Sequence, residues 1–157
     1  MTKKKLSDYL RTDLIYTKAD FQSQEEVFRT IASDAEQAEL VLPGFFQGLT
    51  DREKEFPTGI PLQKFGAAIP HTEADLVSKE FVAIVVNQCP IDFKSMEDNQ
   101  MIVPTKIIFV LGLNEPHAQL EMLQSLMGLL QNDELLAALI AAQDSQELLT
   151  IIKQNHL

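Results

Sequence analysis

The sequence has no tryptophan, only nine Phe and two Tyr, and a single cysteine, Cys89, in 157 residues. One cysteine excludes an internal disulfide and a zinc site built from cysteines. So few aromatic side chains argue against a stacking surface for single-stranded nucleic acid. Positive charge is also scarce, with 13 Lys and Arg against 23 Asp and Glu and a net charge of −10. Because no excess of cations exists to displace counterions, nucleic acid is not an expected partner.

Long apolar runs and glycine-rich motifs are missing as well. Apolar runs such as 81–86 and 107–111 have five or six residues, and 135–142 has eight, far below the ~20 needed to cross a bilayer. The basic segment Met1–Lys5 is followed by mixed, charged residues, so it is not a signal peptide. No glycine-rich phosphate loop and no nucleophile-elbow motif is present. We therefore expect a soluble, cytoplasmic protein that does not insert into membranes.

The chain predicts one domain over residues 1–157, with its core at about 10–150, because no linker or repeat divides it. Short apolar segments rich in β-branched residues predict buried strands, and proline-bearing 89–93 predicts a short edge strand. Ser23 and Glu26 have the form of a capping box before a helical apolar pattern. The predicted strands are 14–16, 66–69, 81–86, 89–93 and 106–111; the predicted helices are about 24–40, 45–55, a long helix carrying Leu120 to Leu130, one beginning at 132–134, and 145–152.

This order of elements predicts an α/β fold: a mixed sheet of about five strands with helices on both faces. In the long helix near the carboxyl end, Leu120, Leu123, Met127 and Leu130 recur at helical spacing, and other apolar residues widen the stripe. The residues that widen it are Met122, Leu126 and Leu129, so the pattern predicts that this helix is well buried.

Three histidines are candidates for chemistry. His156 lies near the end of the chain and His117 at a helix start, and both are typical of surface positions. His71 follows Pro70 where a buried strand ends, and α/β sheets present reactive side chains at such points. A structural loop histidine remains an alternative for His71. A metal site formed with Glu73 and Asp75 is another, although that spacing is common by chance, and no metal or cofactor is expected.

A second segment of interest is Arg52-Glu-Lys-Glu-Phe-Pro-Thr-Gly59. By itself it is compatible with a solvated helix end that carries mixed charges and is followed by a turn. Together with Ala68-Ile-Pro-His71, whose histidine comes twelve residues after Gly59, it resembles the signature of the enzyme IIA domains of the bacterial phosphoenolpyruvate-dependent sugar phosphotransferase system. The similarity is to the fructose/mannitol superfamily, and within it to the galactitol-type branch. It extends through 90–93, 107–111 and 115–123 and covers about residues 10–150.

The resemblance implies a phosphocarrier with a phosphohistidine intermediate, and therefore a phosphotransferase component. His71 would accept a phosphoryl group from the carrier HPr and pass it to a cysteine of the cognate enzyme IIB. The membrane enzyme IIC would then phosphorylate the entering sugar or polyol. Neutral imidazole suits this role because it is nucleophilic near pH 7.

The resemblance also implies roles for three other residues. Arg52 matches the arginine that lies near the phosphohistidine, and a guanidinium can bind two phosphoryl oxygens at once. Thr58 offers a hydroxyl donor for the phosphoryl group. Gln119 stands where many mannitol and fructose members have a second histidine, and a glutamine there supports the galactitol-type branch. Glu73 and Asp75 are expected to point away from the phosphate or to touch a partner.

Partners are expected to dock around His71, with Phe65, Ile69 and Leu76 beside the contact. An acidic acceptor favours a basic donor surface. A regulatory domain of the same family, whose phosphorylation state controls other proteins, remains an alternative function. The sequence does not distinguish these roles and does not identify the sugar, the oligomeric state, or the roles of His117 and Cys89.

Overall fold

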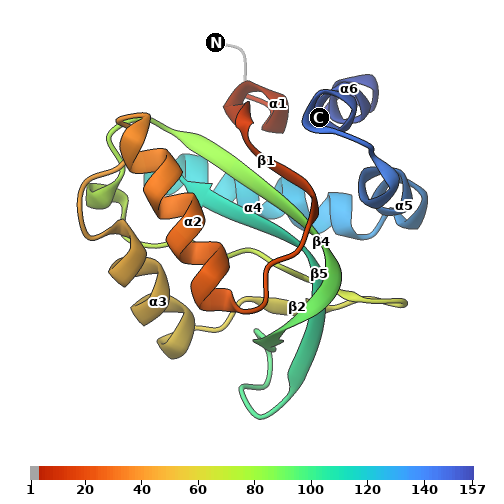
Figure 1. Cartoon of the computed structure of the whole chain (residues 1–157), viewed down its shortest axis with the longest axis horizontal. Helices are drawn as coiled ribbons and strands as arrows, with labels where there is room; N and C mark the ends of the chain where they lie inside the picture. Colours follow the sequence, from red (N-terminus) through yellow and green to blue (C-terminus); the bar gives the residue numbers. More distant parts are fainter. Residues whose placement is uncertain (1–3) are drawn as a thin grey trace.

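The computed structural model describes residues 4–157, so the expectation for Met1–Lys5 lies largely outside the described residues. The strands are β1 (Leu10–Ala19), β2 (Gly59–Pro61), β3 (Gly66–Ala68), β4 (Phe81–Lys94) and β5 (Ile102–Gly112). They form one sheet in the order β1-β4-β5-β3-β2. The pairs β1/β4 and β3/β5 are parallel, while β4/β5 and β2/β3 are antiparallel. The mixed five-stranded sheet is confirmed (Figure 1).

The helices are α1 (Leu6–Tyr9), α2 (Gln24–Gln37), α3 (Phe45–Glu55), α4 (Pro116–Leu130), α5 (Asp133–Ala141) and α6 (Ser145–Gln154), with a 3-10 turn η1 (Ala74–Leu76). One apolar cluster contains side chains of α2 and α3, and the other contains those of α1, α4, α5 and α6. In Figure 1, α2 and α3 lie in front of the sheet and α4 passes behind it. Helices on both faces are therefore confirmed.

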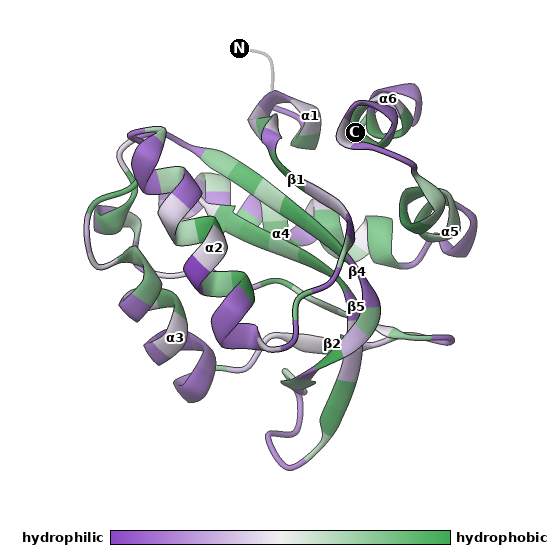
Figure 2. Ribbon diagram, viewed as in Figure 1, coloured by the Kyte–Doolittle hydropathy of each residue, from purple (hydrophilic) through white to green (hydrophobic). Residues whose placement is uncertain are grey.

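The central strands explain why the apolar runs do not alternate with polar residues. Successive side chains of a strand point to opposite faces. In β4, Val82 and Ile84 belong to one apolar cluster, and Ala83 and Val85 belong to the other. Both faces are covered by helices, so every position must be apolar. Figure 2 shows hydrophobic strands at the centre of the molecule and hydrophilic segments on the outward sides of α2 and α3.

The start of α2 follows the predicted cap with one difference. The Ser23 hydroxyl accepts a hydrogen bond from the Glu26 backbone N–H at 3.2 Å. The Glu26 carboxylate, however, accepts from the Gln22 N–H at 3.1 Å rather than from the cap residue. Two backbone donors are still satisfied, which is what stabilises a helix start.

Three predictions about elements need correction. Residues 89–93 are not a separate edge strand, because they continue β4, with Pro90 inside the register shift between Val86 and Ile91. The proline thus falls at the irregularity, where a missing N–H does least damage to the ladder. The turn expected after Pro57 instead contains the start of β2.

The third correction concerns α4. Its buried residues are Met122, Leu126, Leu129 and Leu130, whereas Leu120 is 54% exposed and Met127 is 38% exposed. The predicted stripe therefore lies partly on the wrong side of the helix. Because apolar residues occupy most of the circumference of α4, periodicity alone does not identify the face that meets the sheet. Within residues 4–157, none of the helices combines the length and hydropathy required to cross a membrane.

Candidate functional site

His71 lies just beyond the end of β3, where the chain leaves the sheet. The Leu111 N–H of β5 donates to the Pro70 carbonyl at 2.9 Å, and His71 forms an isolated parallel bridge to Leu111. The backbone that presents the ring is therefore attached to a central strand. The His71 side chain is half-buried, so one part of the ring faces the protein and another part remains accessible.

The two ring nitrogens of His71 have different environments. Nδ1 lies 2.9 Å from the carbonyl oxygen of Ile69. A carbonyl can only accept, so Nδ1 carries the hydrogen in this contact and Nε2 of the neutral ring keeps its lone pair. Burial lowers the pKa of His71; the contact with Ile69 opposes this, Arg52 lowers the pKa further, and Glu73 raises it. The net lowering keeps the imidazole neutral near pH 7.

Arg52 lies in the last turns of α3, close enough for its charge to act on His71. Its Nη1 donates to the Glu73 carboxylate at 3.2 Å, and its guanidinium lies 4.6 Å from the centroid of the Phe56 ring. Within residues 4–157, the buried Nε–H of Arg52 finds no acceptor. The aromatic ring and the carboxylate hold the guanidinium in place, and the bond to Glu73 uses one of its five N–H donors.

Thr58 is buried, at 3% exposed, and is held by Glu53, which is 6% exposed. The Thr58 N–H and hydroxyl donate to the two carboxylate oxygens of Glu53, each at 2.8 Å. The hydroxyl oxygen in turn accepts from the Ile69 N–H at 3.3 Å. From the sequence we expect the Thr58 hydroxyl to donate to a phosphoryl group. In the structure this hydroxyl donates to the Glu53 carboxylate instead.

Glu53 is a buried residue beside the site to which the sequence analysis gives no role. A solvated helix end is one interpretation of its segment, yet Phe45, Leu49 and Glu53 are the buried residues of α3. They recur every four residues, so they share one face of the helix. That spacing was the available signal. Burial raises the pKa of Glu53 to about 7, although the two hydrogen bonds from Thr58 oppose the rise.

Gln119 and Arg52 line one cleft of about 280 Å³, together with Thr72, Glu73, Pro116 and Leu120. His71 and Thr58 line a second cleft of about 490 Å³, which also contains Phe56, Met96, Glu97 and Asp98. The fold thus divides the four candidates between two clefts: Arg52 of α3 and Gln119 of α4 line one, and Thr58, before β2, and His71, after β3, line the other.

The predicted docking residues fare differently. Ile69 is 1% exposed and cannot contact a partner, which corrects that prediction, because it continues β3 into the core. Phe65 and Leu76 are both partly buried and pack against the apolar clusters. The exposed apolar side chains that line the two clefts are Phe56 (53%), Met96 (45%) and Leu120 (54%).

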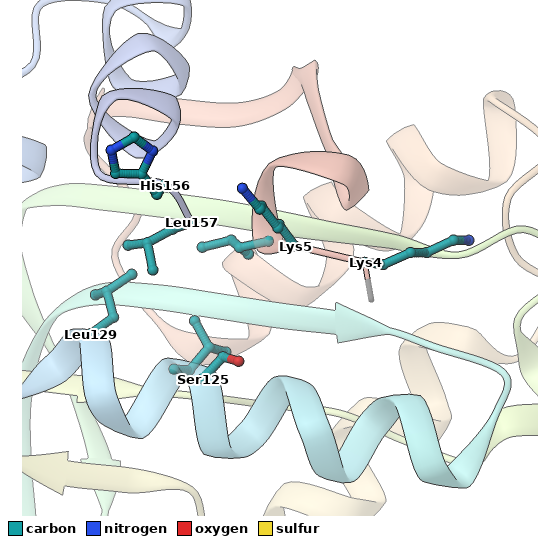
Figure 3. A pocket seen from close by; sticks show the side chains of 8 residues that line it. Lys4, Lys5, Ser125, Leu129, His156 and Leu157 are labelled. Carbon is teal, nitrogen blue, oxygen red and sulfur yellow. The ribbon is translucent and has the colours of Figure 1, made fainter. Parts of the chain in front are cut away.

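Other candidates lie elsewhere. The His117 side chain is 83% exposed and is 3.0 Å from Glu121, one turn further along α4. Within the described part of the chain, no three His, Cys, Asp or Glu side chains gather in a way that could hold a metal ion. A separate hollow of about 250 Å³ lies between the first residues described, α4 and the end of the chain (Figure 3), and shares no lining residue with the two clefts.

The fold defines a class of α/β domain that solved structures share. The nitrogen regulatory protein IIA-Ntr of Neisseria meningitidis superposes with a TM-score of 0.77 at 23% identity, over 93% of this chain and 97% of that one. The enzyme IIA of the Escherichia coli mannitol system, solved in complex with phosphorylated enzyme IIB, gives 0.72 at 21% identity, over 92% and 99%.

Residues 8–155 match the family described as "Phosphoenolpyruvate-dependent sugar phosphotransferase system, EIIA 2". The chain belongs to this family and is a phosphotransferase component. It is 29% identical over 126 residues to the galactitol-specific EIIA component of Escherichia coli K12, covering 80% of this chain and 83% of that protein. The predicted membership of this family is thereby confirmed, and so is the predicted similarity to a galactitol-specific member.

Proposed function

We propose that this protein is a phosphocarrier in which Nε2 of His71 accepts a phosphoryl group from phosphorylated HPr. The N–P bond of the donor breaks as the new N–P bond forms on Nε2. The group then moves to a cysteine of a cognate enzyme IIB, with an S–P bond formed as the N–P bond of His71 breaks. One observation carries the proposal: the half-buried His71 directs Nδ1–H to the Ile69 carbonyl and borders a cleft. This leaves Nε2 as the nucleophile.

Arg52 is proposed to stabilise the transferred group. Phosphoryl transfer depends mainly on positioning and on neutralising charge at the phosphoryl oxygens. The guanidinium is held by Phe56 and Glu73, and it has N–H donors beyond the one that it gives to Glu73. Gln119, which lines the same cleft as Arg52, is proposed to supply an uncharged amide where other members carry a second histidine.

Acidic and apolar side chains around the clefts support a basic protein partner. Glu55, Glu97 and Asp98 line the cleft of His71, and Phe56 and Met96 expose apolar surface there. A complementary basic patch would steer the partners together, and the apolar side chains would bury area in the contact. Association with phosphorylated HPr should therefore slow as ionic strength rises; rates that ignore salt would contradict this docking surface.

The sugar is proposed to be a polyol of the galactitol type, because the relative with 29% identity has that specificity. The sugar would bind to a membrane enzyme IIC, which acts after enzyme IIB in the order of phosphoryl transfer. The reaction of this domain would take place in the cytoplasm. No cofactor is part of the proposal.

The test is phosphorylation by phosphoenolpyruvate, enzyme I and HPr, followed by measurement of acid-labile phosphate. Wild type should be labelled and His71→Ala should not. His117→Ala is the matched control, since His117 is exposed on α4, and it should be labelled like wild type. Equal labelling of His71→Ala and wild type would refute the proposal. Label that enters His71 but never reaches enzyme IIB would favour the regulatory alternative.

A further inference from the structure

The segment that presents His71 is secured by groups outside the sheet ladder. The antiparallel pairing of β3 with β2 ends at the pair Gly59 and Ala68. The N–H of the next residue, Ile69, therefore needs another acceptor, and it finds the Thr58 hydroxyl at 3.3 Å. Because Ile69 is 1% exposed, water is a poor substitute for this acceptor.

Glu53 fixes the orientation of that hydroxyl. One Glu53 oxygen accepts from the Thr58 hydroxyl and the other from the Thr58 N–H, each at 2.8 Å. With its hydrogen directed to Glu53, the hydroxyl keeps a lone pair for Ile69. The Ile69 carbonyl then lies 2.9 Å from Nδ1 of His71. Four hydrogen bonds thus connect a buried carboxyl of α3 to the ring that is proposed to carry the phosphoryl group.

We propose that Glu53 is a positioning residue for His71, acting through Thr58 and the backbone of Ile69. It never touches the phosphoryl group. It holds the backbone N–H of Ile69, which fixes the position of this residue so that its carbonyl, in the following peptide group, accepts from Nδ1 and the imidazole keeps its orientation and its Nε2 lone pair. This inference rests on the proposed function of His71, but it also makes a claim about the free protein. Burial of Glu53 raises its pKa to about 7, because a buried carboxylate loses its hydration.

Two substitutions break the connection at different links. Glu53→Met keeps a linear side chain and removes both acceptors, and Thr58→Val keeps the side-chain shape and removes the hydroxyl. Glu53→Gln is the conservative variant, since its amide accepts from the Thr58 N–H and still contacts the hydroxyl. Thr105→Val is the matched control. Thr105 is 0% exposed and its hydroxyl donates to the Val103 carbonyl at 3.0 Å, so this bond stays within β5 and lies six residues before Leu111, the residue of β5 that pairs with the His71 segment.

The first measurement is the nitrogen NMR spectrum of the His71 ring in the full chain, which reports which nitrogen carries the hydrogen. We expect the Nδ1–H form to dominate in wild type, Glu53→Gln and Thr105→Val, and to lose that dominance in Glu53→Met and Thr58→Val. The second is the rate of phosphorylation by phosphorylated HPr. In the two disruptive variants kcat should fall about tenfold, while KM stays within about twofold because the docking surface is unchanged.

If Glu53→Met does not fold, Thr58→Val provides the same test. An unchanged ring spectrum and an unchanged kcat in the folded disruptive variants would overturn the inference. So would an equal loss in Thr105→Val, because it would indicate general destabilisation. If His71 is not phosphorylated even in wild type, the proposed function fails, and the ring spectrum alone still decides whether Glu53 positions the imidazole.

Discussion

Replacing Glu53 with glutamine should change how the stability of this protein depends on pH. The carboxyl is 6% exposed, and burial raises its pKa from 4.5 to about 7. Between these two values the folded protein keeps a proton that the unfolded chain has already released. The free energy of unfolding therefore falls as the pH rises through this window. The contribution of Glu53 to the free energy of unfolding is fully present below pH 4.5 and is lost above about pH 7.

The size of the effect follows from the two pKa values. Each pH unit in the window corresponds to about 1.4 kcal/mol, which gives a total of about 3 kcal/mol. Between pH 5 and pH 8, wild type should lose about 2.5 kcal/mol relative to Glu53→Gln. Glutamine imitates the protonated carboxyl, because it still accepts from the Thr58 N–H but never becomes charged.

Urea unfolding of both proteins at several pH values between 5 and 8, at constant ionic strength, measures this difference. The comparison of wild type with Glu53→Gln is necessary because His71 changes the stability of both proteins with pH in the opposite direction to Glu53. Its pKa is lowered by burial, so its contribution makes stability rise as the pH approaches 6.5. Glu55→Gln, at an exposed position two residues along α3, is the control and should follow wild type. A constant difference between Glu53→Gln and wild type at all pH values would refute the reasoning.

Other predictions concern the cation of the site and the packing of the sheet. Arg52→Lys should lower the rate of phosphoryl transfer about 100-fold, because an ammonium lacks the planar pair of N–H donors with which a guanidinium binds two oxygens. An unchanged rate in the phosphorylation assay would mean that the arginine has only a structural role. Glu73→Gln should speed phosphorylation and change the midpoint of urea unfolding little, because it frees Arg52 from an exposed ion pair worth about 0–1 kcal/mol while Phe56 still holds the guanidinium; slower transfer would contradict this. Gly112→Ala should destabilise by about 1–3 kcal/mol, because its Cβ would lie 2.2 Å from the buried Phe81 ring. Gly128→Ala, with open space at its Cβ inside α4, should stabilise by about 0.5–1 kcal/mol, and thermal melts of the two glycine variants that shift in the same direction would refute the packing argument.

Much of the fold was predictable because the relevant signals are local. The boundaries of α3, the cap of α2 and the doubly buried strands β4 and β5 follow from spacing, capping residues and apolar runs. For α4 the prediction was wrong at Leu120 and Met127, which are exposed, while Leu126 and Leu130 of the same helix are buried as predicted. In a helix with apolar residues on most sides, the buried face is chosen by the elements that pack against it, and those come from distant parts of the chain.

The candidate site divides in the same way. The sequence by itself placed His71 after a strand and a proline, and the combination of its segment with 52–59 was enough to indicate the family. Only the tertiary structure brought the end of α3 to the end of β3, buried Glu53 and Thr58, and directed Nδ1 of His71 to a backbone carbonyl. The hydrogen bond from Ile69 to Thr58 joins residues 11 positions apart, so it depends on how the elements pack, and residue spacing along the chain carries little information about that packing.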